Sequence, residues 1–142
     1  SIGVDRMFLS IMSAAYCEET LENGEMRVVM KLPQVLAPIK ACIMPLIKKD
    51  GLPEKAREIM DALKFDFKCA YDEKDSIGKR YRRQDAVGTP FCITVDHQTL
   101  EDNTVTIRHR DSMQQDRVAI SDLQGIIDAK VNMKNLFKKI VG

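Results

Sequence analysis

The chain has 142 residues, of which 44% are hydrophobic and 30% charged, and its 22 lysines and arginines nearly balance its 21 aspartates and glutamates. This composition predicts one folded domain and excludes a disordered chain, which needs low hydrophobicity and a high net charge. A net charge of +1 also excludes a purely electrostatic nucleic-acid binder, because it supplies little general attraction to phosphate. The longest apolar stretch, residues 36–47, is interrupted by Lys40 and is too short to span a membrane.

The cysteines and histidines do not form the spacings that metal sites use. No two of the four cysteines form a Cys-x-x-Cys pair, so we predict free, buried thiols and a reducing, cytoplasmic compartment. His97 and His109 have no cysteine or histidine partner at ligand spacing, so no metal is expected. His109 falls on the apolar side of a predicted strand, where a half-buried structural histidine is more typical than a catalyst.

The first 16 residues are apolar almost all round. A helix with so little polar face is normally buried on all sides, and a chain of this length offers too few partners to cover it. Residues 1–16 therefore predict a core helix of a larger upstream domain, which would make this chain a C-terminal fragment. The alternative is a helix packed into a homodimer seam.

The residues after this helix change from a helical to a turn and strand pattern. Asn23-Gly24 predicts a turn and residues 27–32 a strand. Pro33 begins a connector, after which the pattern becomes regular. We therefore divide the chain into 1–33, a remnant of an upstream domain with its connector, and 34–142, a second domain.

Strands and helices alternate from residue 39 onward. The predicted elements are a strand over 39–46, a helix opened by Gly51-Leu52-Pro53, a strand over 67–71, a helix from Ser76 to Gly88, a strand over 91–95, two strands over 104–108 and 117–120, and a helix opened by Ser121 and Gln124 and continued by Met133, Leu136, Phe137 and Ile140. This alternation predicts βαβ units and a mainly parallel sheet. The two strands joined by a turn predict an antiparallel pair at its end. The fold class is therefore α/β.

The second of these helices holds the one basic cluster of the chain. At 100° per residue, Ile77 and Tyr81 lie about 40° apart on a side expected to pack. The opposite side, expected to be exposed, carries Lys79, Arg80, Arg82 and Arg83. A solvated helix face and a contact with a phosphate backbone both remain open.

The strand that begins at Thr104 alternates cleanly. Val105, Ile107 and His109 share one face, and the other face carries Thr104, Thr106, Arg108 and Arg110. Threonine and arginine on one strand face suit hydrogen bonds to base edges, and the acceptor-rich loop before it, residues 96–103, suits cytosine amino groups. The alternative is salt bridging among Arg108, Arg110 and Asp111.

Nucleotide-binding and catalytic signatures are missing from the sequence. No glycine-rich dinucleotide motif follows the first strand of the sheet, and no P-loop is found. No Cys/His or Ser/His pair lies in a recognisable elbow. We therefore expect no catalytic residue in this chain.

Two segments carry a resemblance to a known family, and it extends over essentially the whole chain. They read SIGKRYRRQDAVGTPF (76–91) and TVTIRHRDSMQQ (104–115). In these segments the chain resembles the C-terminal anticodon-binding domain of class II glycyl-tRNA synthetases of the homodimeric type. Its opening, Ser1–Arg6, resembles the third signature motif of class II catalytic domains.

The resemblance implies a mixed five-stranded sheet flanked by three helices, as in class IIa anticodon-binding domains. It implies recognition of the anticodon of glycine tRNA, while a separate catalytic domain of a homodimeric enzyme attaches glycine using ATP with magnesium. Arg6 matches the arginine that contacts the ATP phosphates. This chain alone is expected to bind no cofactor and to be catalytically inactive, and neither a membrane nor DNA is an expected partner.

The resemblance also implies contacts with the tRNA. The positions it marks are Lys74, Ser76, Thr99 and Arg108. The residue patterns add their neighbours Lys79, Arg80, Arg83, Glu101 and Arg110. Two other hypotheses remain at this point: a stand-alone synthetase-like module that binds a protein or regulates a complex, and a small α/β enzyme with an unrecognised site.

Overall fold

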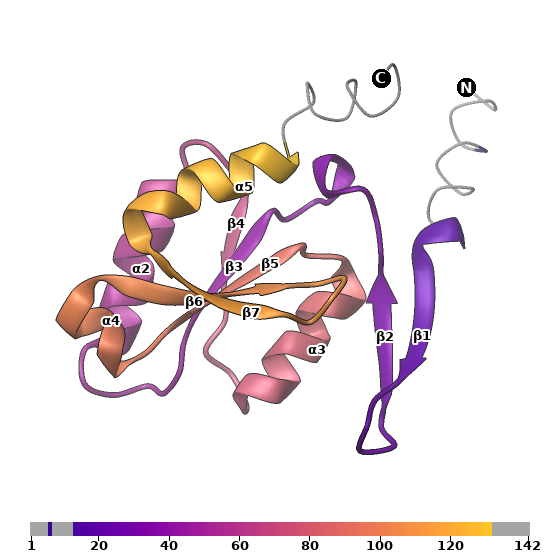
Figure 1. Ribbon diagram of the computed structural model, residues 1–142, viewed down its shortest axis with the longest axis horizontal. Coiled ribbons are helices and arrows are strands. Elements are labelled where there is room, and N and C mark those ends of the chain that lie inside the picture. The colour runs from indigo at the N-terminus through magenta and orange to yellow at the C-terminus, as the bar shows by residue number, and fades with distance from the viewer. Residues whose placement is uncertain (1–5, 7–12, 132–142) are drawn as a thin grey trace.

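A five-stranded sheet forms the centre of the molecule (Figure 1), and the computed structural model describes Arg6 and residues 13–131 of the chain. The strands are β3 (Ala41–Pro45), β4 (Cys69–Tyr71), β5 (Phe91–Val95), β6 (Thr104–His109) and β7 (Gln115–Ala119), in the spatial order β4-β3-β5-β6-β7. Strands β3, β4 and β5 are parallel, and β6 and β7 continue the sheet in antiparallel register. The predicted mixed sheet is confirmed.

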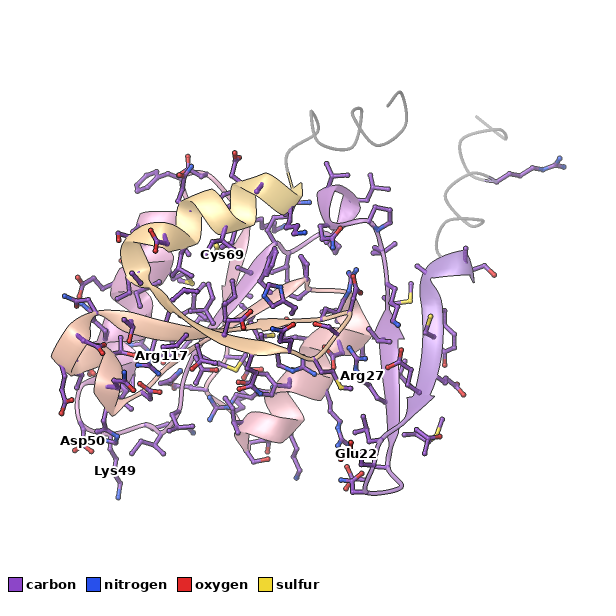
Figure 2. The ribbon with its side chains drawn as sticks, viewed as in Figure 1. Glu22, Arg27, Lys49, Asp50, Cys69 and Arg117 are labelled. Carbon is purple, nitrogen blue, oxygen red and sulfur yellow. The ribbon has the colours of Figure 1, made fainter. Side chains whose placement is uncertain are left out.

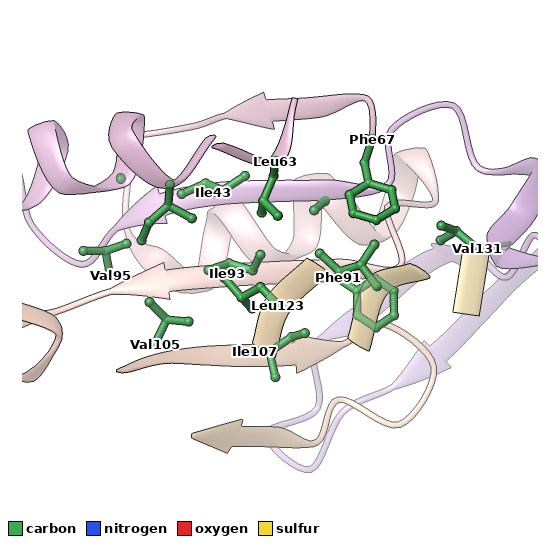
Figure 3. Close-up of a cluster of buried hydrophobic side chains, with 14 of the residues drawn as sticks. Ile43, Leu63, Phe67, Phe91, Ile93, Val95, Val105, Ile107, Leu123 and Val131 are labelled. Atoms are coloured by element: carbon green, nitrogen blue, oxygen red, sulfur yellow. The ribbon is translucent and has the colours of Figure 1, made fainter. Parts of the chain in front are cut away.

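Helices cover both faces of the sheet. They are α2 (Leu52–Leu63), α3 (Ile77–Val87), the short α4 (His97–Asp102) and α5 (Leu123–Val131). The apolar sides of α2 and α5 pack on one face and build the main core around Ile43, Phe91 and Ile107 (Figure 3). Helix α3 packs on the other face, where Ile77 and Tyr81 contact a smaller cluster centred on Met44. The predicted packing side of α3, with Ile77 and Tyr81, is confirmed.

The predicted caps set the ends of α3. The hydroxyl of Ser76 accepts a hydrogen bond from the Lys79 backbone N–H at 3.5 Å, as an N-cap does. Gly88 ends the helix in the left-handed conformation with φ of 87°, which glycine adopts without steric cost.

The segment predicted as an acceptor-rich loop over 96–103 is instead mostly the helix α4. Asp96 and Thr99 form a capping box, in which the Asp96 carboxylate accepts from the Thr99 backbone N–H at 3.1 Å and the Thr99 hydroxyl from the Asp96 N–H at 3.1 Å. Asn103 ends the helix in the left-handed conformation. Polar residues that suggested a loop therefore satisfy the ends of a six-residue helix.

Asp96 also pairs with Arg117 of β7, through contacts of 2.6 and 2.9 Å. These hydrogen bonds hold the pKa of Asp96 below its ordinary value. A lowered carboxyl pKa stabilises the fold above the unfolded pKa of about 4, and this contribution is lost as the pH falls through the folded pKa. We expect Asp96→Asn, which keeps a capping acceptor, to cost about 0.5 to 1 kcal/mol at pH 7 and progressively less from pH 5 to pH 3. Urea unfolding across this range measures the difference, and a constant gap would contradict the assignment.

A two-stranded hairpin lies beside α3. It consists of β1 (Tyr16–Thr20) and β2 (Met26–Met30), which pair in antiparallel register around the predicted turn. Strand β2 overlaps the predicted strand 27–32, whereas β1 was not predicted. Of the predicted helix over 1–16, residues 13–15 are helical and most of the rest lies outside the described residues, as do Met133, Leu136, Phe137 and Ile140.

The four cysteines are free thiols. Cys42 and Cys92 are buried, as predicted, but Cys17 and Cys69 are only half-buried. Burial raises the pKa of Cys42 to about 12 and that of Cys69 to about 11, so both stay protonated and unreactive at neutral pH. None of the described helices is long and apolar enough to cross a membrane.

Candidate nucleic-acid interface

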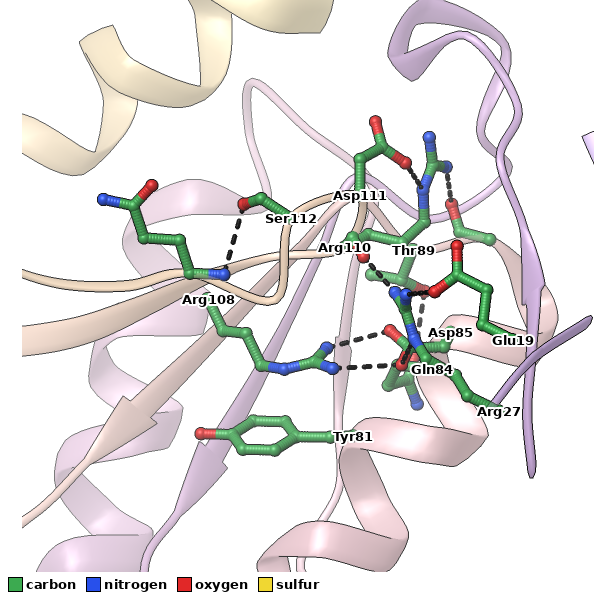
Figure 4. A network of polar contacts seen from close by, with 12 residues as sticks. Glu19, Arg27, Tyr81, Gln84, Asp85, Thr89, Arg108, Arg110, Asp111 and Ser112 are labelled. Atoms are coloured by element: carbon green, nitrogen blue, oxygen red, sulfur yellow. Dashed lines mark hydrogen bonds and ion pairs between the residues drawn. The ribbon is translucent and has the colours of Figure 1, made fainter. Parts of the chain in front are cut away.

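Arg108 does not face solvent, contrary to the prediction. Its guanidinium donates to both oxygens of Asp85 at 2.8 and 3.1 Å and lies 4.7 Å from the ring centroid of Tyr81 (Figure 4). Only 6% of the residue is exposed. The alternation of β6 correctly placed Arg108 on the face opposite Val105 and Ile107, but α3 covers that face at this point. A side-chain contact with a base would require breaking a buried ion pair.

Arg110 and Arg80 are also buried, so their expected exposure is wrong as well. Arg110 donates to the carbonyls of Gly88 and Leu32 at 2.8 and 2.6 Å and to Asp111 at 2.9 Å. Salt bridging among Arg108, Arg110 and Asp111 was the alternative to base contacts, and of these pairs the structure contains Arg110–Asp111. Arg80 donates to the backbone carbonyls of Pro45 and Asp75, because its helix position faces the loop after β3.

Thr99 is fully buried in the capping box of α4, so its hydroxyl is engaged within the protein. The threonines of β6 are covered in a similar way by Arg117, which reaches across from β7. Arg117 donates to the hydroxyls of Thr104 at 2.7 Å and of Thr106 at 3.4 Å. Sequence analysis missed Arg117. Its place in the second strand of the predicted antiparallel pair was the available signal, and the register of the structure sets it opposite Thr106.

The five remaining predicted residues are accessible and gather at one edge of the sheet. Because β3, β4 and β5 are parallel, the segments that follow them leave from the same edge. The segment after β4 and the first turns of α3 carry Lys74, Ser76, Lys79 and Arg83, and α4 after β5 carries Glu101. The structure thus brings part of the predicted set to one surface.

These accessible side chains differ in whether their polar groups have hydrogen-bond or ion-pair partners in the protein. Arg83 donates to Asp72 and Asp75, each at 2.8 Å. The side chains of Lys74, Lys79 and Glu101 form no hydrogen bond or ion pair among the described residues. The lysines can therefore bind phosphate, and Glu101 can accept from a base amino group, without first giving up a partner.

A buried ionic network joins the hairpin to this domain, and sequence analysis missed its centre. Asp85 accepts from Arg27 of β2 at 2.9 Å as well as from Arg108 (Figure 4). Arg27 also donates to Glu19 at 2.6 Å and to the backbone carbonyl of Arg110. Asp85 lies four residues after Tyr81, so its place on the packing side of α3 was the available signal.

Other predictions concern His109, a possible metal site and Arg6. His109 is half-buried as predicted. Its ring lies edge-on to Phe91, with 5.6 Å between the two ring centroids, and its Nε2 lies 3.3 Å from a carboxylate oxygen of Asp116. Within the described residues, no group of three or more histidine, cysteine, aspartate or glutamate side chains gathers as metal ligands would. Arg6 is exposed, and its predicted role with ATP stays a prediction.

The sheet topology, with helices on both faces, defines an α/β domain whose accessible polar residues lie at the carboxyl edge of its parallel strands. The family described as "Anticodon binding domain" matches residues 40–130. The chain belongs to this anticodon-binding domain family.

Its relatives share much of its sequence. Proteins named glycine-tRNA ligase from Borrelia hermsii and Macrococcus caseolyticus are 47% and 52% identical over 131 residues, which is 92% of this chain. A third, from Rhodopirellula baltica, is 52% identical over 135 residues. The chain spans only 29%, 28% and 25% of the lengths of these three relatives.

A solved structure shares the fold. The RNA-binding domain of threonyl-tRNA synthetase from Cryptosporidium parvum superposes with a TM-score of 0.64 and 21% identity, over 70% of this chain and 25% of that chain. At this identity the likeness supports the arrangement of strands and helices alone. The expected fold, a mixed five-stranded sheet with helices, is confirmed.

Proposed function

We propose that this chain binds the anticodon arm of glycine tRNA as part of a longer, cytoplasmic glycine-tRNA ligase. The observation that carries the proposal is the identity of about half the residues with glycine-tRNA ligases over 92% of the chain. In the longer protein, a homodimer, a separate catalytic domain would join glycine to the tRNA using ATP with magnesium. Arg6 would contact the ATP phosphates there, and the division into 1–33 and 34–142 would mark the end of the catalytic domain.

The five accessible residues fall into two groups with different proposed roles, contact with phosphates and contact with a base. Lys74 and Lys79 would bind backbone phosphates, with Ser76 beside them as a neutral donor, and Arg83 would add to them if its carboxylate partners release it. Glu101 would accept from an exocyclic amino group of one of the two cytosines in glycine anticodons. The buried Arg80, Thr99, Arg108 and Arg110 would act by holding these segments in place.

A titration with two RNA hairpins tests the proposal. The full chain is titrated with a labelled anticodon stem-loop of glycine tRNA, and with a stem-loop in which both anticodon cytosines are replaced. We expect the first RNA to bind at least about tenfold more tightly, since a lost base contact costs about 1 to 3 kcal/mol. Equal affinities would contradict anticodon reading by this chain.

A carboxylate variant then tests the assignment of Glu101. Glu101→Gln is expected to reduce the preference for the cytosine pair by about threefold or more, because a hydrogen bond to a neutral amide oxygen is weaker than one to a charged carboxylate. Glu58→Gln, at an exposed position of α2, is the matched control and should leave the preference unchanged. If both variants keep the full preference, Glu101 does not contact a cytosine.

A further inference from the structure

The lysines that lack partners are unevenly distributed over the protein. Within residues 13–131, the ammonium groups without a hydrogen bond or ion pair are those of Lys48, Lys49, Lys68, Lys74, Lys79 and Lys130. Four of these six lie where β3 and β4 end or in the first turn of α3. Lys68 and Lys130 lie elsewhere, before β4 and at the end of α5.

Lys48 and Lys49 belong to the loop Leu46–Asp50, which follows β3. Strand β3 lies between β4 and β5 and parallel to both, so this loop leaves the sheet between the segment after β4 and the helix α4 after β5. Figure 2 shows Lys49 and Asp50 at the end of the molecule where α4 lies. The loop, whose five residues are all exposed, therefore separates the two segments that carry Lys74 and Glu101.

Side-chain contacts fix the loop to both neighbours. Arg80 of α3 bridges the carbonyl of Pro45, at the start of the loop, and the carbonyl of Asp75. At the other end, the Asp50 carboxylate lies 2.9 Å from Nε2 of His97 on α4. These contacts make one continuous surface of three chain segments and give the buried Arg80 a positioning role.

We propose that the loop Leu46–Asp50 is a third RNA-contacting segment, in which Lys48 and Lys49 each bind a phosphate of the anticodon arm. The inference rests on the proposed function, because it takes the same RNA as ligand. Lysine ammonium groups contact phosphate as point charges, and such contacts fix the position of an RNA without reading its bases. Their effect is therefore on affinity and salt dependence and not on the choice of anticodon.

Two double variants of equal charge test the inference. The full chain carrying Lys48→Gln and Lys49→Gln is compared with the chain carrying Lys68→Gln and Lys130→Gln, using both stem-loops at several salt concentrations. We expect the loop variant to bind the glycine stem-loop about three- to tenfold more weakly at low salt and to lower the slope of log affinity against log salt by about 1.5, the value for two phosphate contacts. The preference for the cytosine pair should not change.

The outcomes separate the two proposals. Equal losses in the two double variants would overturn the inference, since only the overall charge would then matter, and anticodon reading by the unsubstituted chain would still stand. A changed base preference in the loop variant would overturn the phosphate assignment. If the unsubstituted chain does not distinguish the two RNAs while the loop variant alone loses affinity, the proposed anticodon reading fails and the phosphate contacts stand.

Discussion

Replacing Asp85 with alanine is expected to lower the free energy of unfolding by about 3 to 5 kcal/mol. The carboxylate is 1% exposed and is shared by Arg27 and Arg108, which are themselves buried. Removal of the acid leaves the Arg108 guanidinium in the interior without a counter-charge and leaves Arg27 with Glu19 as its one remaining carboxylate partner among the described residues. The cost arises from this unpaired buried charge, and much less from the loss of the attraction itself.

A matched substitution separates this effect from the loss of any carboxylate on a helix. Asp61→Ala removes an exposed acid of α2 that pairs with Lys64 at 3.1 Å, and it should cost less than about 1 kcal/mol. Urea unfolding of both variants gives the comparison. Amide hydrogen exchange should further show faster opening of β1 and β2 in Asp85→Ala, because Arg27 is the buried anchor of the hairpin. A loss similar to that of Asp61→Ala would refute a central role for Asp85.

The order of elements could be predicted because local signals and tertiary packing agree. Ser76 and Gly88 delimit α3 as predicted, since a cap is satisfied by the neighbouring backbone whatever packs around it. The strand over 91–95 matches β5 at both ends. It is buried throughout, so its pattern is an apolar run, interrupted only by Thr94 and bounded by a proline and an aspartate.

Burial of the arginines could not be predicted from periodicity. Alternation along β6 gives the face on which Arg108 lies, but it does not show that α3 brings Asp85 over that face. Sequence analysis likewise grouped Arg80 with the exposed side of α3, although at 100° per residue it lies about 60° from Ile77, at the border of the packing side. There the loop after β3 folds back and supplies the carbonyl of Pro45. Long polar side chains can bury their charge where a distant segment supplies acceptors, and that segment is set by the tertiary fold.

Only part of the candidate site was therefore visible in the sequence. Lys74 and Glu101 are accessible as expected, because short segments at the ends of parallel strands are exposed. Lys48 and Lys49 were not singled out, since two lysines in a loop are ordinary. Their interest comes from the strand order, which places β3 between β4 and β5.

Gly88→Ala is expected to destabilise the protein by about 2 to 3 kcal/mol. Its φ of 87° is unfavourable for any residue with a Cβ, at a cost of about 1 to 2 kcal/mol. An added Cβ would also lie 3.1 Å from the backbone oxygen of Met30 and 3.3 Å from the Leu32 side chain, and crowding of this kind adds about 1 kcal/mol or more. The substitution therefore pushes apart α3 and the chain that leaves the hairpin.

Gly51 offers a control in which a substitution meets the unfavourable positive φ but no crowding of the added Cβ. It also has a positive φ, 77°, but an added Cβ there meets nothing within 4 Å. Gly51→Ala should therefore cost only about 1 to 2 kcal/mol, and the excess in Gly88→Ala, measured by urea unfolding, reports the contact with the hairpin. Equal losses at the two glycines would mean that the hairpin yields freely at Met30. Since Arg110 holds the carbonyls of both Gly88 and Leu32, this part of the chain has little freedom to move, and the larger loss is expected at Gly88.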